Sequence, residues 1–338
     1  MKKLLTIALS TTALVAASAA HAGTLDDVKA KGFLQCGVNT GAAGFAFTDD
    51  KGEYQGFDVA ICKAMAAAIF DDPTKVKYTP TTGKTRFTAL QSGEVDVLAR
   101  NTTWTLSRDV DLKFTFGPVN YYDGQGFLVR SDLGVSSAKE LDGATICIQT
   151  GTTTELNLAD FFRANNINYT PVPIETQAEA EERYLAKACD AYTTDASGLA
   201  SAKSAFENPD EHVVLPDIIS KEPLAPLVRQ GDDEWADVMS WTVRALILAE
   251  ELGITKGNVD EMVANPPNPD VARLLGVEGE FGQMLGLDKD WAVRAIKSEG
   301  NYGEIFEQYI GKGSPLGLDR GLNALYTNGG LMYAPPVR

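Results

Sequence analysis

Residues 144–174, ATICIQTGTTTELNLADFFRANNINYTPVPI, decide the class of fold. The segment begins with an apolar stretch of strand length, passes through a Gly-Thr-Thr turn into a helix-forming stretch, and ends in a second β-rich stretch. Two strands joined by a helix run parallel, because the crossover returns the chain to the same end of the sheet. The segment therefore predicts a strand–helix–strand unit of an α/β protein.

The same alternation of strand and helix recurs on both sides of this segment. The elements predicted before it are a helix at 24–32, strands at 33–39, 75–81 and 94–100, and helices at 57–70 and 86–93. The elements predicted after it are a helix at 176–189, a strand at 190–195 and helices from 232 to about 309. Apolar residues recur at three- and four-residue steps in 57–70, so we expect this helix to bury one face. Each sheet is expected to be mostly parallel and flanked by helices.

Two extended segments, 113–130 and 213–230, separate these series and indicate that the chain crosses twice between two α/β units. The first unit is then discontinuous and the second is inserted into it. The predicted boundaries are a signal peptide at 1–22, a first lobe at 23–120, an inserted second lobe at 121–224, and completion of the first lobe with a C-terminal extension at 225–338.

The N-terminus predicts secretion. A basic start, MKK, precedes an apolar run at 4–20, and Ala20–His21–Ala22 forms an A-x-A cleavage site. A membrane anchor is the alternative, but the run is short and a cleavage site follows it. We expect cleavage near Ala22–Gly23 and a mature protein in the periplasm.

Charge and histidine content exclude several classes of function. The chain has 46 acidic and 30 basic residues, a formal net charge of -16, which disfavours nucleic acid and anionic lipid as partners. Beyond the signal the only histidine is His212, so a zinc centre is not expected, and no G-x-S-x-G elbow is present. We predict no metal, no cofactor and no catalytic residue.

The four cysteines suit an oxidising compartment. Their spacing favours the pairs Cys36–Cys62 and Cys147–Cys189, one in each half of the chain. Four cysteines allow three pairings, and buried free thiols are the alternative.

Polar residues follow the predicted strands at the ends where open α/β sheets bind ligands. Arg108 can grip a carboxylate in a bidentate fork, with Thr103 adding a hydroxyl. The helix that starts near Thr152 and Thr153 offers free backbone amides to the same anion, whereas Asp195 favours a cation. Carboxylate and ammonium together predict an amino-acid zwitterion as ligand.

Each of these residues also has a simpler explanation. Arg108 at a strand–helix junction is often only a surface ion pair. The Gly-Thr-Thr run is often only a helix cap, and Asp195 can cap the helix that follows it. The coincidence of all three at equivalent strand ends favours the binding site.

Four segments together resemble one protein family. They are GEYQGFDVAICKAMA (52–66), LQSGEVDVLARNTTWTLSR (90–108), CIQTGTTTE (147–155) and CDAYTTDASG (189–198). In combination they resemble periplasmic solute-binding protein family 3, the polar amino-acid receptors of ABC uptake systems. VVLPDIISKEPLAPLVRQGDDEW (213–235) and NYGEIFEQYIG (301–311) look typical of the general L-amino-acid binding branch, the Aap/Bzt type.

The resemblance implies a type II periplasmic binding protein, or Venus flytrap, that closes on an L-amino acid and presents it to a cognate inner-membrane ABC permease. It implies a ligand carboxylate bound by Arg108 and Thr103, with a backbone contact from Asn101 and an anion loop at Thr152 and Thr153. The ammonium-binding carboxylate is then Asp195. We expect a monomer with polar or acidic amino acids favoured.

One position departs from the family pattern. In NTGAAGFAF (39–47), Ala42 stands where family members usually place an aromatic residue that stacks on the ligand. The loss of this wall implies broad specificity. Phe45, Phe47, Trp104 and Tyr122 are candidates for replacing the wall, and we include Phe45 and Trp104 among the predicted binding residues.

Two other functions remain open. A small-molecule dehydratase on the same scaffold would need Glu53 or Asp195 as its general acid or base. A receptor that signals instead of feeding a transporter would need the same closing lobes.

Overall fold

A computed structural model describes residues 23–338. The predicted signal peptide and its cleavage site lie outside the described residues. Within 23–338, the helices are all too short or too polar to cross a membrane.

The first lobe is built on a five-stranded sheet in the order β4-β1-β5-β14-β6. Its strands are β1 (Leu34–Asn39), β4 (Val76–Thr81), β5 (Val97–Leu98), β6 (Phe114–Phe116) and β14 (Leu227–Arg229). The first three strands are parallel, as the sequence predicts, and β14 runs antiparallel to both β5 and β6.

The second lobe is built on a sheet in the order β10-β9-β11-β8-β12. Its strands are β8 (Gln125–Arg130), β9 (Ala144–Gln149), β10 (Tyr169–Ile174), β11 (Ala191–Asp195) and β12 (His212–Val214). Strands β9, β10 and β11 are parallel, and β8 is antiparallel to β11 and β12. Both sheets are therefore mixed, because the segments that cross between the lobes add antiparallel strands to each parallel unit.

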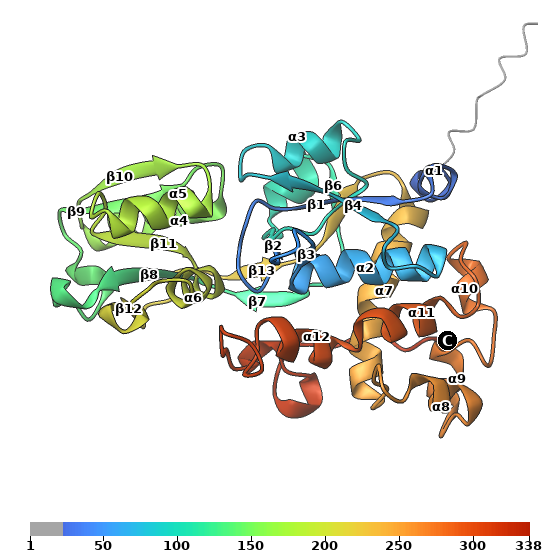
Figure 1. Cartoon of the computed structure of the whole chain (residues 1–338). Helices are drawn as coiled ribbons and strands as arrows, with labels where there is room; N and C mark the ends of the chain where they lie inside the picture. The colour runs from blue at the N-terminus through green and yellow to red at the C-terminus, as the bar shows by residue number, and fades with distance from the viewer. Residues whose placement is uncertain (1–22) are drawn as a thin grey trace, which may run out of the picture.

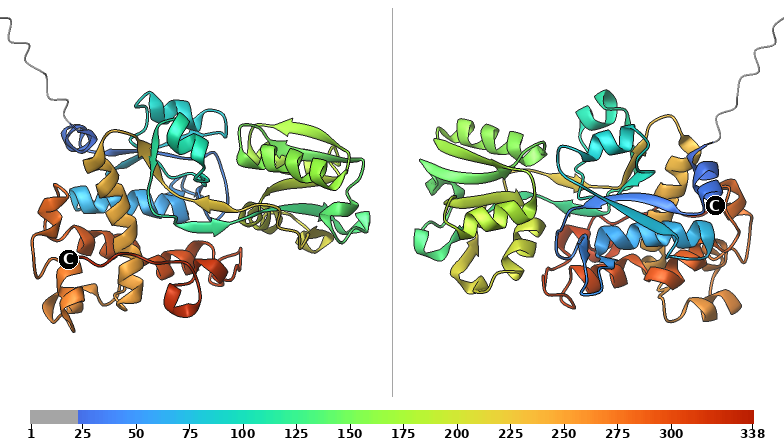
Figure 2. Two further views of the ribbon diagram at one scale, coloured as in Figure 1. Left: turned by 180° about the vertical axis from the view of Figure 1, so that it is seen from behind. Right: turned by 45° about the horizontal axis from the view of Figure 1, so that its top comes forward.

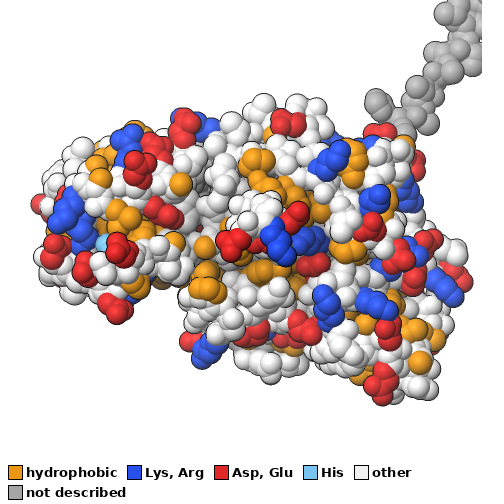
Figure 3. Space-filling view, in the orientation of Figure 1, with side chains coloured by type: hydrophobic (Ala, Val, Ile, Leu, Met, Phe, Trp, Pro, Cys, Tyr) orange, Lys and Arg blue, Asp and Glu red, His pale blue; other side chains and the backbone are white. Residues whose placement is uncertain are grey.

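Two short strands join the lobes. β7 (Tyr121–Asp123) and β13 (Glu222–Leu224) pair antiparallel as a separate two-stranded ribbon. Figures 1 and 2 show this ribbon running between the two lobes. In the space-filling view the two lobes are in contact, and acidic and basic side chains are interspersed over the face of both lobes that is in view (Figure 3).

Helices cover both sheets, and most of them belong to the first lobe. The first lobe has α1 (Thr24–Lys31), α2 (Phe57–Phe70), α3 (Arg86–Gln91), α7 (Asp233–Glu251), α8 (Val259–Ala264), α9 (Pro269–Leu274), α10 (Phe281–Met284), α11 (Trp291–Glu299) and α12 (Tyr302–Tyr309). The second lobe has α4 (Thr153–Asn165), α5 (Gln177–Leu185) and α6 (Ala196–Ser204). A small hairpin, β2 (Phe47–Thr48) and β3 (Tyr54–Gln55), precedes α2.

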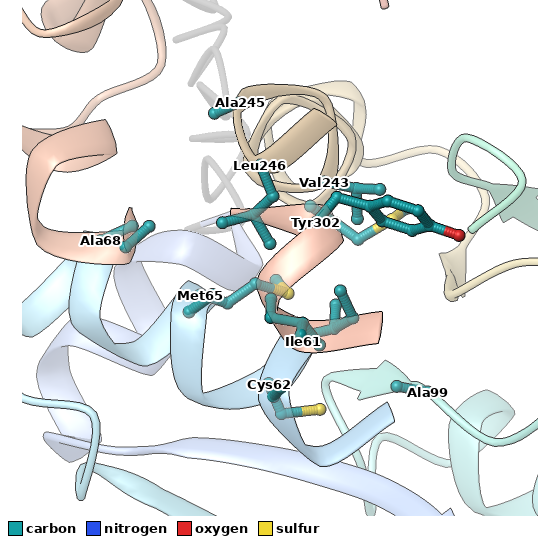
Figure 4. Packing of buried hydrophobic residues seen from close by; sticks show 14 of the residues in the cluster. Ile61, Cys62, Met65, Ala68, Ala99, Val243, Ala245, Leu246 and Tyr302 are labelled. Atoms are coloured by element: carbon teal, nitrogen blue, oxygen red, sulfur yellow. The ribbon is translucent and has the colours of Figure 1, made fainter. Parts of the chain in front are cut away.

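The prediction that α2 buries one face is wrong, because nearly every residue of this helix is buried. One side packs on β1, and α7 and α11 cover the rest. Figure 4 shows Ile61 and Met65 of α2 in the same cluster as Leu246 of α7 and Tyr302 of α12. The C-terminal helices thus enclose α2, whose first turn contacts the loop at Asn101.

The structure contains the two disulfides that the spacing favours. Cys36–Cys62 ties β1 to α2 in the first lobe. Cys147–Cys189 ties β9 to the turn before β11 in the second lobe. Each bond fixes a strand whose carboxyl end points toward the gap between the lobes.

Candidate ligand-binding site

A polar cavity lies between the lobes and is open to solvent at its mouth, with about 540 Å³ of empty space if the open solvent there is included. Six of the predicted binding residues line it, three from each lobe: Asn101, Thr103, Phe45, Thr152, Thr153 and Asp195. Ala42 lines it as well, at the place of the missing aromatic wall. The strand-end residues that the sequence selected in the two lobes therefore meet in one cavity.

The first-lobe wall is held by a buried carboxylate. Asp58, in the first turn of α2, accepts a hydrogen bond of 3.0 Å from the backbone N–H of Asn101. Asn101 has a φ of 41°, in the left-handed region that asparagine tolerates better than most residues. Burial raises the pKa of Asp58 to about 7. Asp58 thus positions a binding loop without lining the cavity itself.

The second-lobe wall is the start of α4. Thr152 is the N-cap residue, and its hydroxyl accepts a hydrogen bond of 3.3 Å from the backbone N–H of Glu155. The Thr152 side chain therefore acts as a helix cap, which is the simpler explanation given above for the Gly-Thr-Thr run. The Thr153 hydroxyl points elsewhere and lies 3.3 Å from the hydroxyl of Thr103 in the first lobe.

Asp195 ends β11 and precedes α6, but its side chain makes no capping hydrogen bond. Burial, followed by the negative charges of Asp123 and Glu222, raises the pKa of Asp195 well above its usual range. Arg86 and Arg108 oppose this rise. A cation placed beside Asp195 would relieve the cost of ionising this carboxyl group.

Arg108 and Trp104 are the two predicted residues that do not line the cavity. Arg108 is buried in a π-helical turn, Ser107–Asp111, where its Nη1 donates a 2.8 Å hydrogen bond to the carbonyl of Thr103. Burial lowers the pKa of Arg108 to about 10, so the guanidinium stays charged at neutral pH. Trp104 stacks on Phe116 with a centroid distance of 5.6 Å and is 42% exposed. Arg108 therefore lies directly behind Thr103 in the first-lobe wall of the cavity. Trp104 lies outside the cavity.

Two further arginines, Arg86 and Arg100, line the cavity and were not selected from the sequence. They are only 2% and 3% exposed. The Nε of Arg86 and an Nη of Arg100 are buried without a hydrogen-bond partner among the described residues. Burial lowers the pKa of both, that of Arg100 to about 10, and the nearby positive charge of Arg108 adds to the lowering in each. Arg100 follows β5 by two residues and directly precedes the binding loop, so the strand-end pattern could have found it.

Glu222 was also not selected from the sequence. It lies on β13, is 1% exposed, and accepts hydrogen bonds from the hydroxyls of Thr103 and Thr153, the latter at 2.9 Å. Asn157 and Ser220 donate to its other oxygen at 2.7 and 2.6 Å. One carboxylate on the connecting ribbon thus joins both walls of the cavity. Its only signal in the sequence is that it is a charged residue within the extended, largely apolar segment 213–230.

His212 takes no part in the cavity. It begins β12, and its ring lies 2.9 Å from the hydroxyl of Tyr184 in the core of the second lobe. The residues that meet between the lobes are instead hydroxyls, amides, guanidinium groups and carboxylates, which are groups that bind a small charged molecule.

Comparison with known proteins identifies the family of the chain. Residues 34–255 match the family described as bacterial extracellular solute-binding proteins, family 3. The chain is 63% identical over 339 residues to the general L-amino acid-binding periplasmic protein AapJ of Rhizobium johnstonii, covering 99% of both chains. It is also 63% identical, over 96% of both chains, to the glutamate/glutamine/aspartate/asparagine-binding protein BztA of Rhodobacter capsulatus.

A solved structure shares the fold over nearly the whole chain. It is an ABC transporter periplasmic binding protein from Brucella ovis with glutathione bound, 61% identical to this chain. The match has a TM-score of 0.92 and covers 94% of this chain and 100% of the other.

Proposed function

The chain belongs to family 3 of the bacterial extracellular solute-binding proteins, and from this membership we propose that it is the periplasmic amino-acid-binding component of an ABC transporter. One observation carries the proposal: a cavity between two lobes combines buried guanidinium groups with a carboxylate that lacks a capping bond. A zwitterion matches both charges. The relatives are binding proteins by name, which favours a binding protein over the dehydratase.

In this proposal the ligand ammonium binds Asp195 and the ligand α-carboxylate binds the wall formed by Thr103, Thr153 and Arg108. The support for the first contact is the raised pKa of Asp195, which an adjacent cation would lower again. The support for the second is the closeness of the two threonine hydroxyls, with Arg108 bonded to Thr103 from behind. Asn101 and Thr152 add backbone contacts.

Arg86 and Arg100 give the site a preference for polar and acidic side chains. Their unpaired, buried N–H groups are costly unless an acceptor meets them, and a side-chain carboxylate or carboxamide supplies one. Ala42 leaves room around the ligand where family members usually have an aromatic ring, so several amino acids fit.

A γ-glutamyl peptide is the second candidate ligand. The Brucella ovis relative holds glutathione. The γ-glutamyl end of glutathione carries an α-carboxylate and an α-ammonium like a free amino acid, and its glycine end carries a second carboxylate. Asp195 with the Thr103 wall can bind the first end, and Arg86 with Arg100 can bind the second.

The lobes would act as a clamp. We place the lobe boundaries at 120/121 and 224/225, within or beside the β7–β13 ribbon, which serves as the hinge. A ligand that contacts both lobes shifts the population toward the closed form. A cognate inner-membrane permease then recognises the closed monomer, after signal cleavage near Ala22–Gly23 and release into the periplasm.

Calorimetric titration of the ligand-stripped mature protein tests the proposal. L-Glutamate, L-glutamine, L-aspartate, L-alanine and glutathione are titrated into the wild type, Asp195→Asn, and the exposed control Asp210→Asn. We expect tight binding of several of these ligands by the wild type and the control, and a loss of at least about 100-fold in Asp195→Asn. A wild type that binds none of the five ligands contradicts the proposal.

A further inference from the structure

The two lobes touch backbone to backbone at one lip of the cavity. Gly83 lies just before α3 in the first lobe, and Thr150 and Gly151 lie just before α4 in the second. A Cβ atom built on Gly83 would stand 2.7 Å from the carbonyl oxygen of Thr150 and 3.1 Å from Cγ2 of Thr152. A Cβ atom on Gly151 would stand 3.2 Å from the backbone of Gly83. The absence of side chains at these two positions permits this approach.

Gly83 is not required by its own backbone conformation. Its φ lies outside the left-handed region that Gly151 occupies at 74°. An alanine at position 83 would therefore be tolerated by the local chain in isolation. The conflict would come from the other lobe, and only when the lobes are this close.

Charged groups next to Gly83 reach across the same lip. Lys84 Nζ lies 2.9 Å from Glu175 Oε1 in the second lobe, and both side chains are more than half exposed. Arg86 Nη2 donates to the carbonyl of Gly151 at 3.5 Å. Residues 83, 84 and 86 thus contact the second lobe through a close backbone approach, an exposed ion pair and a long hydrogen bond.

We propose that Gly83 sets how closely the two lobes approach each other. We also propose that the Lys84–Glu175 ion pair stabilises the closed arrangement at this edge of the cavity. Gly83 is a positioning residue that does not line the cavity. The proposal rests on the ligand-driven closure proposed above and names the residues that define its end point. A side chain at position 83 meets a backbone oxygen, which cannot rotate away, so the lobes must stay apart.

The closed form holds a ligand by contacts from both lobes, so a variant that closes incompletely should release the ligand faster. We expect Gly83→Val to raise the dissociation rate constant of L-glutamate by about tenfold or more, with the association rate constant changed less than threefold. Gly83→Ala should have a smaller effect in the same direction. The melting temperature without ligand should stay the same, because the open form has no clash.

Stopped-flow measurements on the mature protein test this expectation, with Gly257→Val as the matched control. Gly257 is exposed and has an ordinary φ, and the nearest atom to a Cβ built on it is Oγ1 of Thr255, at 3.9 Å. The control should keep the wild-type rate constants. A dissociation rate constant for Gly83→Val within twofold of the wild type would overturn the proposal.

Charge reversal tests the ion pair. Lys84→Glu and Glu175→Lys should each speed release by about two- to fivefold at low salt, and the double variant should return within twofold of the wild type. The effect should vanish at 1 M salt, where charges on the surface are screened. A double variant that releases the ligand as fast as either single one argues against a direct pair.

A second readout needs no ligand, because an irreversible cross-link accumulates each time a ligand-free molecule closes transiently. A carbodiimide that joins amines to adjacent carboxylates should link Lys84 to Glu175 in the wild type and in Gly257→Val, and the link should be lost in Gly83→Val. Mass spectrometry of the digested protein detects it. If the wild type forms the link but binds no amino acid, the proposed function fails and the closure contact stands. If it binds amino acids but Gly83→Val keeps both the link and the wild-type rate, only the closure contact fails.

Discussion

The hydroxyl groups of Thr103 and Thr153 lie 3.3 Å apart, although 50 positions separate them in the sequence and they belong to different lobes. Both donate to one oxygen of Glu222, on the ribbon that connects the lobes. The two walls of the cavity and the hinge therefore share a single buried acceptor. Changes at any of the three residues should affect closure as well as binding.

Glu222→Ala should lower the free energy of unfolding by about 2–4 kcal/mol, because it leaves buried hydroxyl and amide donors without an acceptor. Urea unfolding of the variant beside the exposed control Glu207→Ala measures the loss. Glu222→Gln keeps one acceptor oxygen and should lose less. An alanine variant as stable as its control would show that these hydrogen bonds contribute nothing.

Amino-acid affinity should fall as the pH falls through the raised pKa of Asp195. The pKa is raised without ligand, and a bound ammonium lowers it, so binding releases a proton wherever the free protein is protonated. The neighbouring Asp123, with a pKa raised to about 6 by burial, adds to the dependence. Calorimetry in two buffers of different ionisation enthalpy measures the proton release near pH 6. Proton uptake in place of release would contradict the assignment.

Arg86→Met should weaken binding of L-glutamate about tenfold more than binding of L-alanine. The guanidinium is buried beside two other arginines, and an anionic side chain relieves that repulsion where a methyl group does not. The exposed Arg163→Met serves as the control. Removing a buried charge that lacks a full set of partners should also leave stability unchanged or raise it. Equal losses for both amino acids would argue against a side-chain subsite.

Asp58 should make the protein less stable as the pH rises from about 4 to about 7. The pKa of this carboxyl group is about 7 in the folded protein against an ordinary 3.8, so the folded state binds the proton more tightly across that window. Asp58→Asn should flatten the curve and gain about 1–3 kcal/mol at pH 8. Thermal unfolding from pH 4 to 8, with the exposed Asp50→Asn as control, follows it. If the melting temperature rises from pH 4 to 8 in the wild type but not in Asp58→Asn, the predicted loss of stability with rising pH is contradicted.

Removing the disulfide between Cys147 and Cys189 should cost about 3–4 kcal/mol, because the bond closes a loop of 42 residues in the unfolded chain. The double variant C147S/C189S is compared with the wild type by urea unfolding. Both cysteines are fully buried, so reductant added to the folded wild type should act slowly. An unchanged midpoint would mean that the bond does not constrain the unfolded state.

The local parts of the fold follow from the sequence. The strand–helix–strand unit predicted from 144–174 appears as β9, α4 and β10, because hydrophobic period and capping residues are set by neighbours in the chain. The strand predicted at 94–100 is assigned only over Val97–Leu98, since its later residues turn into the binding loop.

The remaining features depend on contacts between distant segments. The full burial of α2 comes from α7 and α11, more than 160 residues away in the sequence. Glu222 acquires its partners only when the returning crossing pairs with β7. Arg86 faces the cavity because the second lobe lies against α3. Periodicity and spacing do not predict contacts between such distant segments. Asp195 and Thr153, in contrast, lie at or just after the ends of strands that the sequence does predict.

The position of β14 has a consequence for the order in which the protein folds. This strand lies between β5 and β6 in the first sheet, yet it is made after the whole second lobe has been synthesised. The second sheet, in contrast, is contiguous from Gln125 to Val214 and can form as soon as that stretch is available. Until Leu227–Arg229 arrive, β5 has an unpaired edge, the kind of edge on which chains aggregate. A chain leaving a translocation pore should therefore complete its inserted lobe first and its N-terminal lobe last.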